Sequence, residues 1–253
     1  LPNFGFLRGC TVELVLDAAS HGHNSLVICS SRKSCMECAL KLCQLERWQE
    51  LCANDPLVEE EDSVLGKGKK KLLAEVAPMP STEELIHCMR FRVGFHNGAM
   101  SSIQRECVEK AYRKKILRVI FCTTTLSTGV NLPARRVIFQ DLKMGTEFLA
   151  IDKYRQSCGR AGRTGDEFGE SFLVMLDRPT PRHWQVAREL MTGTIPAVKS
   201  RLSENSILEG LARMVLEAIW HHGREGCSRQ HLETFLARSF LGVGYVSPFS
   251  PLL

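Results

Sequence analysis

Two arginines three residues apart have the clearest chemical meaning in this sequence. Arg160 and Arg163 lie in the segment Tyr154-Arg-Gln-Ser-Cys-Gly-Arg-Ala-Gly-Arg-Thr-Gly165, next to glycine and alanine residues. The spacing predicts that both guanidinium groups lie on one face of a helical turn. The small residues leave room for another surface to approach. Two permanently charged, planar groups at one point suit a polyphosphate, because they stabilise the charge that develops during phosphoryl transfer.

Hydroxyl-bearing residues directly follow two short apolar runs. One run leads into Ser30-Ser-Arg-Lys33, and the other leads into Thr123-Thr-Thr-Leu-Ser-Thr-Gly-Val-Asn-Leu-Pro-Ala134. An open α/β sheet places its ligand contacts at the carboxyl ends of its strands. Hydroxyls, arginine and backbone N–H groups bind phosphates without reading bases. The alternative is that these hydroxyls cap the helices that follow. Both can hold, because a helix N-terminus is itself a phosphate site.

In order and spacing, these segments resemble the second motor domain of superfamily 2 helicases. LVICSSRK (residues 26–33) resembles motif IV, TTTLSTGVNLPARRVI (residues 123–138) motif V, and QSCGRAGRTG (residues 156–165) motif VI. GFHNGAM (residues 94–100) resembles the segment between motifs IV and V. The wording of motifs V and VI is most similar to the DNA-repair branch that holds the helicase domain of DNA polymerase theta and the polymerase-theta-like helicases. The resemblance runs from about residue 25 to residue 178, and more weakly to about residue 241.

The resemblance implies the second lobe of an ATP-dependent 3′→5′ DNA helicase that acts in repair in the nucleus, on single-stranded or forked DNA. Arg160 and Arg163 would meet the γ-phosphate, Arg163 as the arginine finger, and Gln156 would sense nucleotide in the same cleft. Gly129 and Asn131 would approach the nucleotide and couple it to the nucleic acid. The nucleic-acid backbone would be bound by Ser30, Ser31, Arg32, Thr124 and Thr125.

The sequence lacks the other half of such a motor. ATP and Mg²⁺ would be held mainly by a first RecA-like lobe with a phosphate-binding loop. Gly66-Lys-Gly-Lys-Lys70 lacks the G-x-x-x-x-G-K-[ST] pattern, and no apolar strand precedes it or the acidic run Glu59–Asp62. We therefore expect this lobe alone not to hydrolyse ATP. Since the chain begins with Leu1, we also expect it to be a fragment or a processed chain.

Two other interpretations share these motifs. An RNA helicase of the exosome-associated group would have the same arginine pair, although GVNLPARRVI and the absence of a long insertion after motif V favour DNA. A truncated, non-catalytic homologue that binds nucleic acid or a partner would also lack the phosphate loop. Intact motifs V and VI argue against that reading.

Bulk composition is that of a soluble globular protein, with 44% hydrophobic and 24% charged residues among 253. The net charge of +5 fits a polyanionic partner. No run approaches the roughly 18 apolar residues of a membrane span. Eleven cysteines, many within apolar patterns, indicate reduced, buried, intracellular thiols. The lone pair in Cys35-Met-Glu-Cys38 has no second pair or histidines at ligand spacing, so no metal site is predicted.

Strands that alternate with helices predict a RecA-like α/β domain at residues 1–180, with a parallel sheet covered by helices on both faces. Helices are expected at residues 10–20, 32–51, 82–90, 102–114 and 150–158, and strands at 25–29, 93–95, 116–122, 135–140 and 169–176. Residues 54–82, with charge blocks between prolines, are expected to form a surface insert. Residues 181–253 are expected to be an all-α region that resembles a winged-helix domain, with helices at 183–192, 203–222 and 228–239.

The sequence also gives expectations for the segment between motifs V and VI and for His96. In relatives, the region between motifs V and VI carries a hairpin that parts the duplex, and here Met144 and Phe148 are the candidate wedges. His96 follows a strand, and the family usually has a second histidine where this chain has Asn97. We expect His96 to be structural rather than catalytic.

Overall fold

The computed structural model describes residues 7–54, 71, 74, 83–124, 132–162, 168–175, 178–195, 208–221 and 226–239. The chain divides into two compact units, Leu1–Ile195 and Pro196–Leu253. The expected insert at 54–82 lies almost entirely outside the described residues, as do its lysine run and acidic block.

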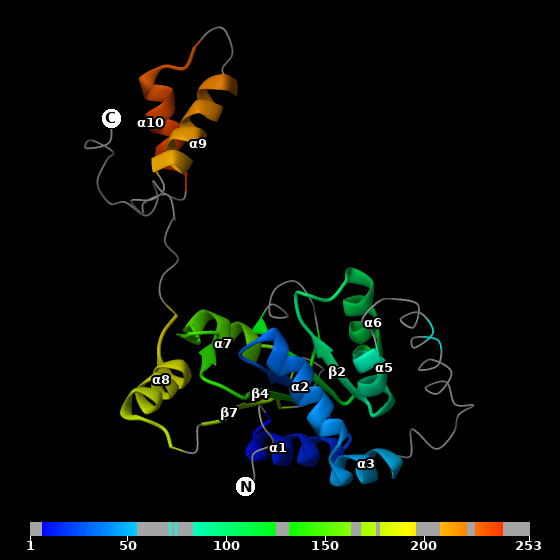
Figure 1. The fold of residues 1–253 in the computed structure, drawn as a ribbon. Helices are drawn as coiled ribbons and strands as arrows, with labels where there is room; N and C mark the ends of the chain where they lie inside the picture. Colours follow the sequence, from blue (N-terminus) through cyan, green and yellow to red (C-terminus); the bar gives the residue numbers. More distant parts are fainter. Residues whose placement is uncertain are drawn as a thin grey trace. The chain divides into compact units, whose positions relative to one another are not determined.

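Five parallel strands form the centre of the first unit (Figure 1). In order across the sheet they are β2 (Val93–His96), β3 (Val119–Cys122), β1 (Ser25–Ile28), β4 (Arg136–Phe139) and β7 (Glu170–Leu173). Every residue of β1, β2 and β3 is buried, whereas β7 is a partly exposed edge. Near-continuous apolar runs are typical of parallel strands that are covered on both faces, and they made these strands predictable.

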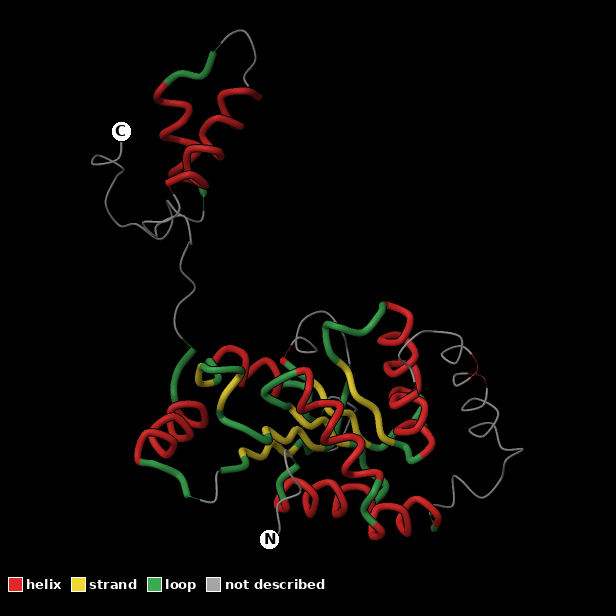
Figure 2. The backbone as a smooth tube through the Cα atoms, in the orientation of Figure 1, coloured by secondary structure: helices red, strands yellow, loops and turns green. Residues whose placement is uncertain are grey.

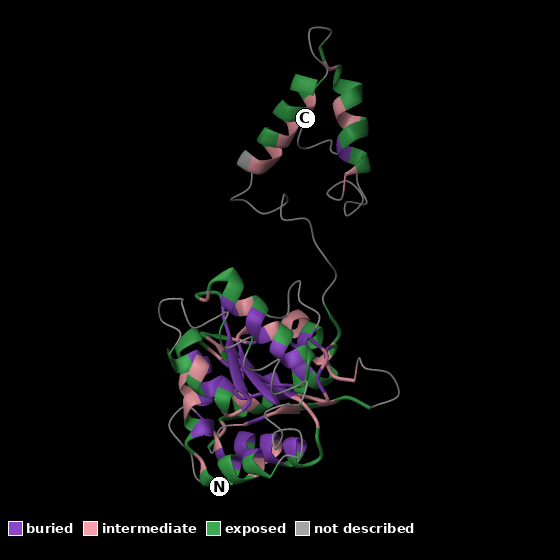
Figure 3. Cartoon of the chain, turned by 90° about the vertical axis from the view of Figure 1, so that its right-hand side faces the viewer, coloured by how far each residue is buried: buried purple, intermediate pink, exposed green. Residues whose placement is uncertain are grey.

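Helices cover both faces of the sheet (Figures 1 and 2). Helix α1 (Gly9–Ser20) packs on β1 and β4, while α2 (Arg32–Cys43) packs on β2 and β3 together with α5 (Glu83–Arg90). Helix α6 (Ser102–Arg113) follows β2, and α7 (Ile151–Cys158) packs on α8 (Pro181–Thr192). The buried strands lie between these helices in Figure 3. The predicted RecA-like α/β fold is thus confirmed.

The single helix expected at residues 32–51 is wrong, because the chain forms two helices there. Helix α2 ends at Cys43, and α3 (Glu46–Ala53) begins after Leu45. The break lets Trp48 become fully buried while its indole N–H donates to the Phe91 carbonyl at 2.9 Å. A buried indole needs such a partner, and neither glycine nor proline marks the break in the sequence.

The second unit contains two described helices, α9 (Leu208–His221) and α10 (Arg229–Arg238). Ser228 caps α10 by accepting a hydrogen bond from the His231 N–H at 3.2 Å. The helical character expected after residue 180 is confirmed, and α8 lies in the first unit. The segment 242–248, considered as a wing, lies outside the described residues. None of the described helices is long and apolar enough to cross a membrane.

Candidate nucleotide and nucleic-acid site

The carboxyl ends of the central strands form one edge of the sheet. Ile28 at the end of β1 is in register with Cys122 of β3 and Phe139 of β4, and Cys122 is in register with His96 of β2. The loops that follow therefore leave the sheet at the same level. Ser30 and Thr124 each lie two residues beyond such an end and are partly exposed. The structure thus brings two of the predicted backbone-binding segments to one edge.

A short hairpin joins this edge. Strands β5 (Lys143–Met144) and β6 (Glu147–Phe148) pair in an antiparallel manner, and Gly145 turns the chain with a φ of +65°. Its N–H donates to the Ser30 carbonyl at 3.1 Å. On the other side, the loop after β2 comes close to Arg32, whose guanidinium lies 4.0 Å from where a Cβ of Gly98 would stand. Segments after β1, β2 and β4 therefore meet around Ser30 and Arg32.

Ser31 caps α2, as the helix-capping alternative predicted. Its hydroxyl accepts a hydrogen bond from the Ser34 N–H at 3.1 Å, and the Ser34 hydroxyl accepts one from the Ser31 N–H at 3.0 Å. This reciprocal arrangement fixes the start of a 12-residue helix whose first turn has no acidic residue. The exposed Arg32 lies at that start. A phosphate would thus meet the positive end of the helix dipole together with a guanidinium.

His96 is buried and paired with an acidic side chain. Its side chain is 5% exposed, and its Nε2 lies 3.1 Å from a Glu109 oxygen. Arg113 donates to the other oxygen of that carboxylate at 3.2 Å. Burial lowers the pKa of His96, and this effect outweighs the opposite effect of Glu109. The neighbouring Asn97 accepts a hydrogen bond from the Ala99 N–H at 2.9 Å and so shapes the turn into α6.

The turn that carries Arg160 does not continue the helix, so the predicted helical turn is wrong. Helix α7 ends at Cys158, and Ala161 forms a parallel bridge with Ala134. The Ala134 N–H donates to the Arg160 carbonyl at 3.1 Å, and the Gly162 N–H donates to the Ala134 carbonyl at 2.9 Å. Gly162 has a φ of +72°, which favours glycine. Tertiary hydrogen bonds to the end of motif V therefore determine this turn.

The predicted nucleotide-contacting residues fall into three groups. Arg160 is only 5% exposed, so the lobe covers nearly all of it. Its charge nevertheless reaches Cys122, where it opposes the burial that raises the pKa of that thiol. Gln156 is exposed on α7. The remaining predicted residues lie outside the described residues: Arg163, Gly129, Asn131 and, among the nucleic-acid contacts, Thr125.

The backbone of the arginine turn lies at the amino ends of β4 and β7. Ala134 precedes β4, and the Glu170 N–H at the start of β7 donates to the Arg135 carbonyl at 2.9 Å. Ser30, Thr124 and the hairpin lie beyond the opposite ends of the strands. The structure therefore separates the backbone of the candidate nucleotide turn from the candidate nucleic-acid edge.

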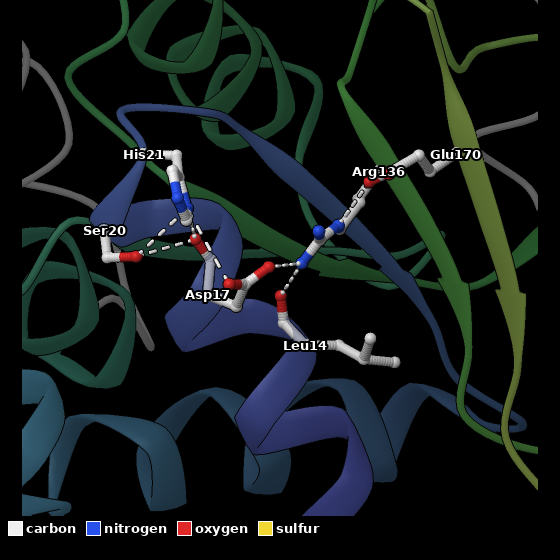
Figure 4. Close-up of polar contacts among 6 residues, drawn as sticks. All are labelled: Leu14, Asp17, Ser20, His21, Arg136 and Glu170. Atoms are coloured by element: carbon white, nitrogen blue, oxygen red, sulfur yellow. Dashed lines mark hydrogen bonds and ion pairs between the residues drawn. The ribbon is translucent and has the colours of Figure 1, made fainter.

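Sequence reasoning missed a polar network at this amino edge (Figure 4). Arg136 lies 2.6 Å from an Asp17 oxygen and donates to Glu170 at 2.7 Å and to the Leu14 carbonyl at 2.8 Å. Its guanidinium also lies 5.2 Å from the Phe172 ring centre. The hydrogen bond from Arg136 lowers the pKa of Asp17. The network joins α1 to β4 and β7. An arginine opening an otherwise apolar strand was the available sequence signal.

The cysteines are free thiols, and eight of the eleven are buried. The Gln140 amide donates to the Cys38 sulfur at 3.0 Å, which ties α2 to the end of β4. Hydrogen bonds with Cys35 and Cys38, together with burial, raise the pKa of Cys29 well above its ordinary value. Within the described part of the chain, no three histidine, cysteine or acidic side chains are placed to hold a metal ion.

The hairpin expected between motifs V and VI is present, but its apolar residues do not form its tip. Met144 and Phe148 are partly buried against the core, whereas Gly145 and Thr146 form the turn. The Phe148 ring packs edge-on against His183, with ring centres 5.6 Å apart. Lys143 and Arg182 lie 5.4 Å and 5.8 Å from the same ring centre. Phe148 thus anchors the hairpin base to α8.

Comparison with known proteins gives consistent matches. Residues 63–165 match the family described as "Helicase conserved C-terminal domain". The chain is 32% identical over 236 residues to the ATP-dependent DNA helicase Hel308 of Methanocella arvoryzae, covering 90% of this chain and 30% of that protein. It is 31% identical over 198 residues to the helicase POLQ-like protein of Drosophila melanogaster, covering 78% of this chain and 18% of that protein. Mouse DNA polymerase theta is 29% identical over 244 residues, covering 92% of this chain and 9% of that protein. The chain thus spans less than a third of these relatives.

Proposed function

The chain belongs to the superfamily 2 helicases and contains their second RecA-like domain, and we propose that it is the C-terminal motor lobe of an ATP-dependent 3′→5′ DNA helicase of the repair type. Its partners are single-stranded or forked DNA and an upstream RecA-like lobe with a phosphate-binding loop. That lobe holds most of the contacts to ATP and Mg²⁺. The nucleus is the proposed place of action.

The observation that supports this proposal is that Ser30 and Arg32 and the backbone of the turn that carries Arg160 lie at opposite ends of one sheet. Ser30 and Arg32 lie at the carboxyl edge beside the hairpin, where backbone phosphates of a strand can be bound without reading its sequence. The arginine turn begins at the amino ends of β4 and β7. A motor needs both, because it must grip a strand and respond to ATP.

We assign the arginine finger to Arg163. Arg160 is 5% exposed and its backbone is held by Ala134, so it acts from inside the lobe and supports the turn. Gln156, exposed on α7, senses nucleotide in the same cleft. Gly129 and Asn131 of motif V approach the nucleotide, while Ser31, Thr124 and Thr125 contribute to the grip on the nucleic acid.

The test is ATP hydrolysis by the longest natural form of the protein, measured without nucleic acid, with single-stranded DNA and with single-stranded RNA. We expect strong stimulation by DNA. In the same protein, Arg163→Ala is expected to reduce the stimulated rate by about 10³-fold or more, as for other arginine fingers, with DNA binding largely unchanged.

Arg188→Ala, at an exposed arginine of α8, is the matched control and is expected to retain wild-type turnover. Wild-type turnover in Arg163→Ala would refute the finger assignment. Stimulation mainly by RNA would move the protein to the RNA branch, and no stimulation by either nucleic acid would favour a binding module.

A further inference from the structure

Gly169 lies where two backbone segments approach too closely for any side chain. A Cβ at residue 169 would stand 2.2 Å from the Ala161 carbonyl carbon, 2.4 Å from the Gly162 nitrogen and 2.6 Å from the Ala161 oxygen. The φ of Gly169 is not in the left-handed region, so space rather than backbone conformation requires glycine here. All three neighbouring atoms belong to the turn that follows Arg160.

That turn is held from two sides. On one side, two hydrogen bonds join it to Ala134 at the end of motif V. On the other side, the chain entering β7 presses against it at Gly169, and the next residue, Glu170, is joined to Arg135 by its N–H. The turn therefore lies between the segment that enters β4 and the segment that enters β7. Its position depends on how closely those segments can approach.

We propose that Gly169 is a positioning residue for the arginines of motif VI. Its missing side chain lets the start of β7 lie against Ala161 and Gly162, and this contact holds the arginine-bearing turn where it acts on ATP. The inference rests on the proposed function, because that function gives Arg160 and Arg163 their role at ATP. Gly169 would hold Arg160 in position and direct the chain toward Arg163. Gly169 itself would touch neither nucleotide nor DNA.

Adding one methyl group at this position should move the turn. The atoms that it would meet are backbone atoms, so no side-chain rotation can relieve the overlap. Restoring ordinary contact from 2.2 Å requires a displacement of about 1 Å, and such misplacement of a catalytic group can cost about 10²-fold in rate. We therefore expect Gly169→Ala to lower kcat by about 100-fold and to leave the KM for ATP and the affinity for DNA nearly unchanged.

The experiment compares Gly169→Ala with Gly94→Ala in the longest natural form of the protein. Gly94 lies in β2, at the opposite edge of the sheet, where a Cβ would meet the Leu117 side chain at 2.8 Å. Gly94→Ala therefore adds the same methyl group against a buried side chain, far from the turn, and controls for a general loss of stability. Three quantities are measured: the thermal midpoint, kcat and KM with saturating single-stranded DNA, and hydrogen exchange of the Ala134 and Gly162 amides.

The expected result is faster exchange at Ala134 and Gly162 and a reduced kcat in Gly169→Ala only. Unchanged exchange at both amides would overturn the proposal, whether or not the protein hydrolyses ATP. Faster exchange with wild-type kcat would also overturn it, because the turn would then move without consequence. An equal loss of kcat in Gly94→Ala would reduce the effect to general instability and refute the positioning role. If the wild-type protein showed no DNA-stimulated ATP hydrolysis, the proposed function would be refuted instead. Amide exchange at Ala134 and Gly162 would still show whether Gly169 holds the turn in place.

Discussion

Replacing Arg136 with methionine is expected to lower the thermal midpoint of the first unit by roughly 4–12 °C. Methionine keeps an unbranched apolar stem but removes the guanidinium that joins Asp17, Glu170 and the Leu14 carbonyl (Figure 4). The side chain of Arg136 is only 14% exposed, so water cannot easily replace it. Loss of the guanidinium should therefore lower the free energy of unfolding measurably, unlike the loss of an exposed arginine.

The size of the stability loss follows from the hydrogen bonds and water contacts that each partner of Arg136 keeps once the guanidinium is gone. The Leu14 carbonyl lies inside α1 and keeps its helical partner but loses its charged donor, and a hydrogen bond from a charged group is worth about 1.5–3 kcal/mol. The Glu170 carboxylate is 38% exposed and can be rehydrated, so that pair is worth less than about 1 kcal/mol. Asp17 is more exposed still and should contribute least. A total of about 2–3 kcal/mol, at roughly 2–4 °C per kcal/mol, gives the stated range.

The assay is thermal unfolding of Arg136→Met beside Arg47→Met. Arg47 also makes two hydrogen bonds to one carboxylate, that of Glu13, but its side chain is 65% exposed. We expect Arg47→Met to change the midpoint by less than about 2 °C, because exposed pairs contribute little. An equal drop in the thermal midpoint of the two variants would refute this prediction, because burial would then not determine how much the contacts of an arginine stabilise the fold.

Acid provides a second check on Arg136. The hydrogen bond from Arg136 lowers the pKa of Asp17 in the folded state. That stability is present above the unfolded pKa of aspartate, near 3.9, and is lost as the pH falls through the lower folded value. The difference between wild type and Arg136→Met should therefore narrow below about pH 4. A difference that stayed constant to lower pH would show that Asp17 does not take part.

Two further predictions concern the carboxyl edge. Wild-type stability should fall as the pH drops below about 6.5, because the buried His96 has a lowered pKa and the unfolded state takes up its proton first. His96→Asn should flatten this slope in pH-dependent denaturant unfolding, whereas the exposed His87→Asn should not, and an unchanged slope in His96→Asn would contradict this account. Arg32→Ala should weaken binding of single-stranded DNA for every sequence and reduce the logarithmic salt slope by about one phosphate contact. Lys41→Ala, at the other end of α2, is the control, and a salt slope as steep as wild type in Arg32→Ala would remove Arg32 from the interface.

Local sequence patterns were enough to predict the structure of segments whose own residues determine their conformation. The apolar runs 25–29, 93–95 and 116–122 predicted three of the buried strands, because a parallel strand covered on both faces has few alternatives. The reciprocal cap at Ser31 follows from a hydroxyl residue three positions before a side chain that can bond back. The motif VI sequence identifies its arginines, but it does not predict the conformation of the turn that carries Arg160.

Features that depend on distant partners were not predictable from local patterns. The break between α2 and α3 exists because Trp48 reaches the Phe91 carbonyl, forty-three positions further along the chain. The arginine turn depends on Ala134 and on the space left by Gly169, neither of which is visible in the helical spacing of Arg160 and Arg163. The stabilising effect of Arg136 likewise depends on the Leu14 carbonyl, which belongs to another element.

Strand β4 connects the two proposed ends of the motor. The segment before it holds the arginine turn, and the segment after it leads through Gln140 into the hairpin that contacts Ser30. The first and last of its four residues are three steps of about 3.3 Å apart, so the strand separates the two ends by roughly 10 Å, and it is paired on both sides. Changes at such separate sites usually act additively. Loss of grip in Arg32→Ala and loss of turnover in Gly169→Ala should therefore be separable defects, because each variant disturbs one end of β4 while the paired strand between them stays in place.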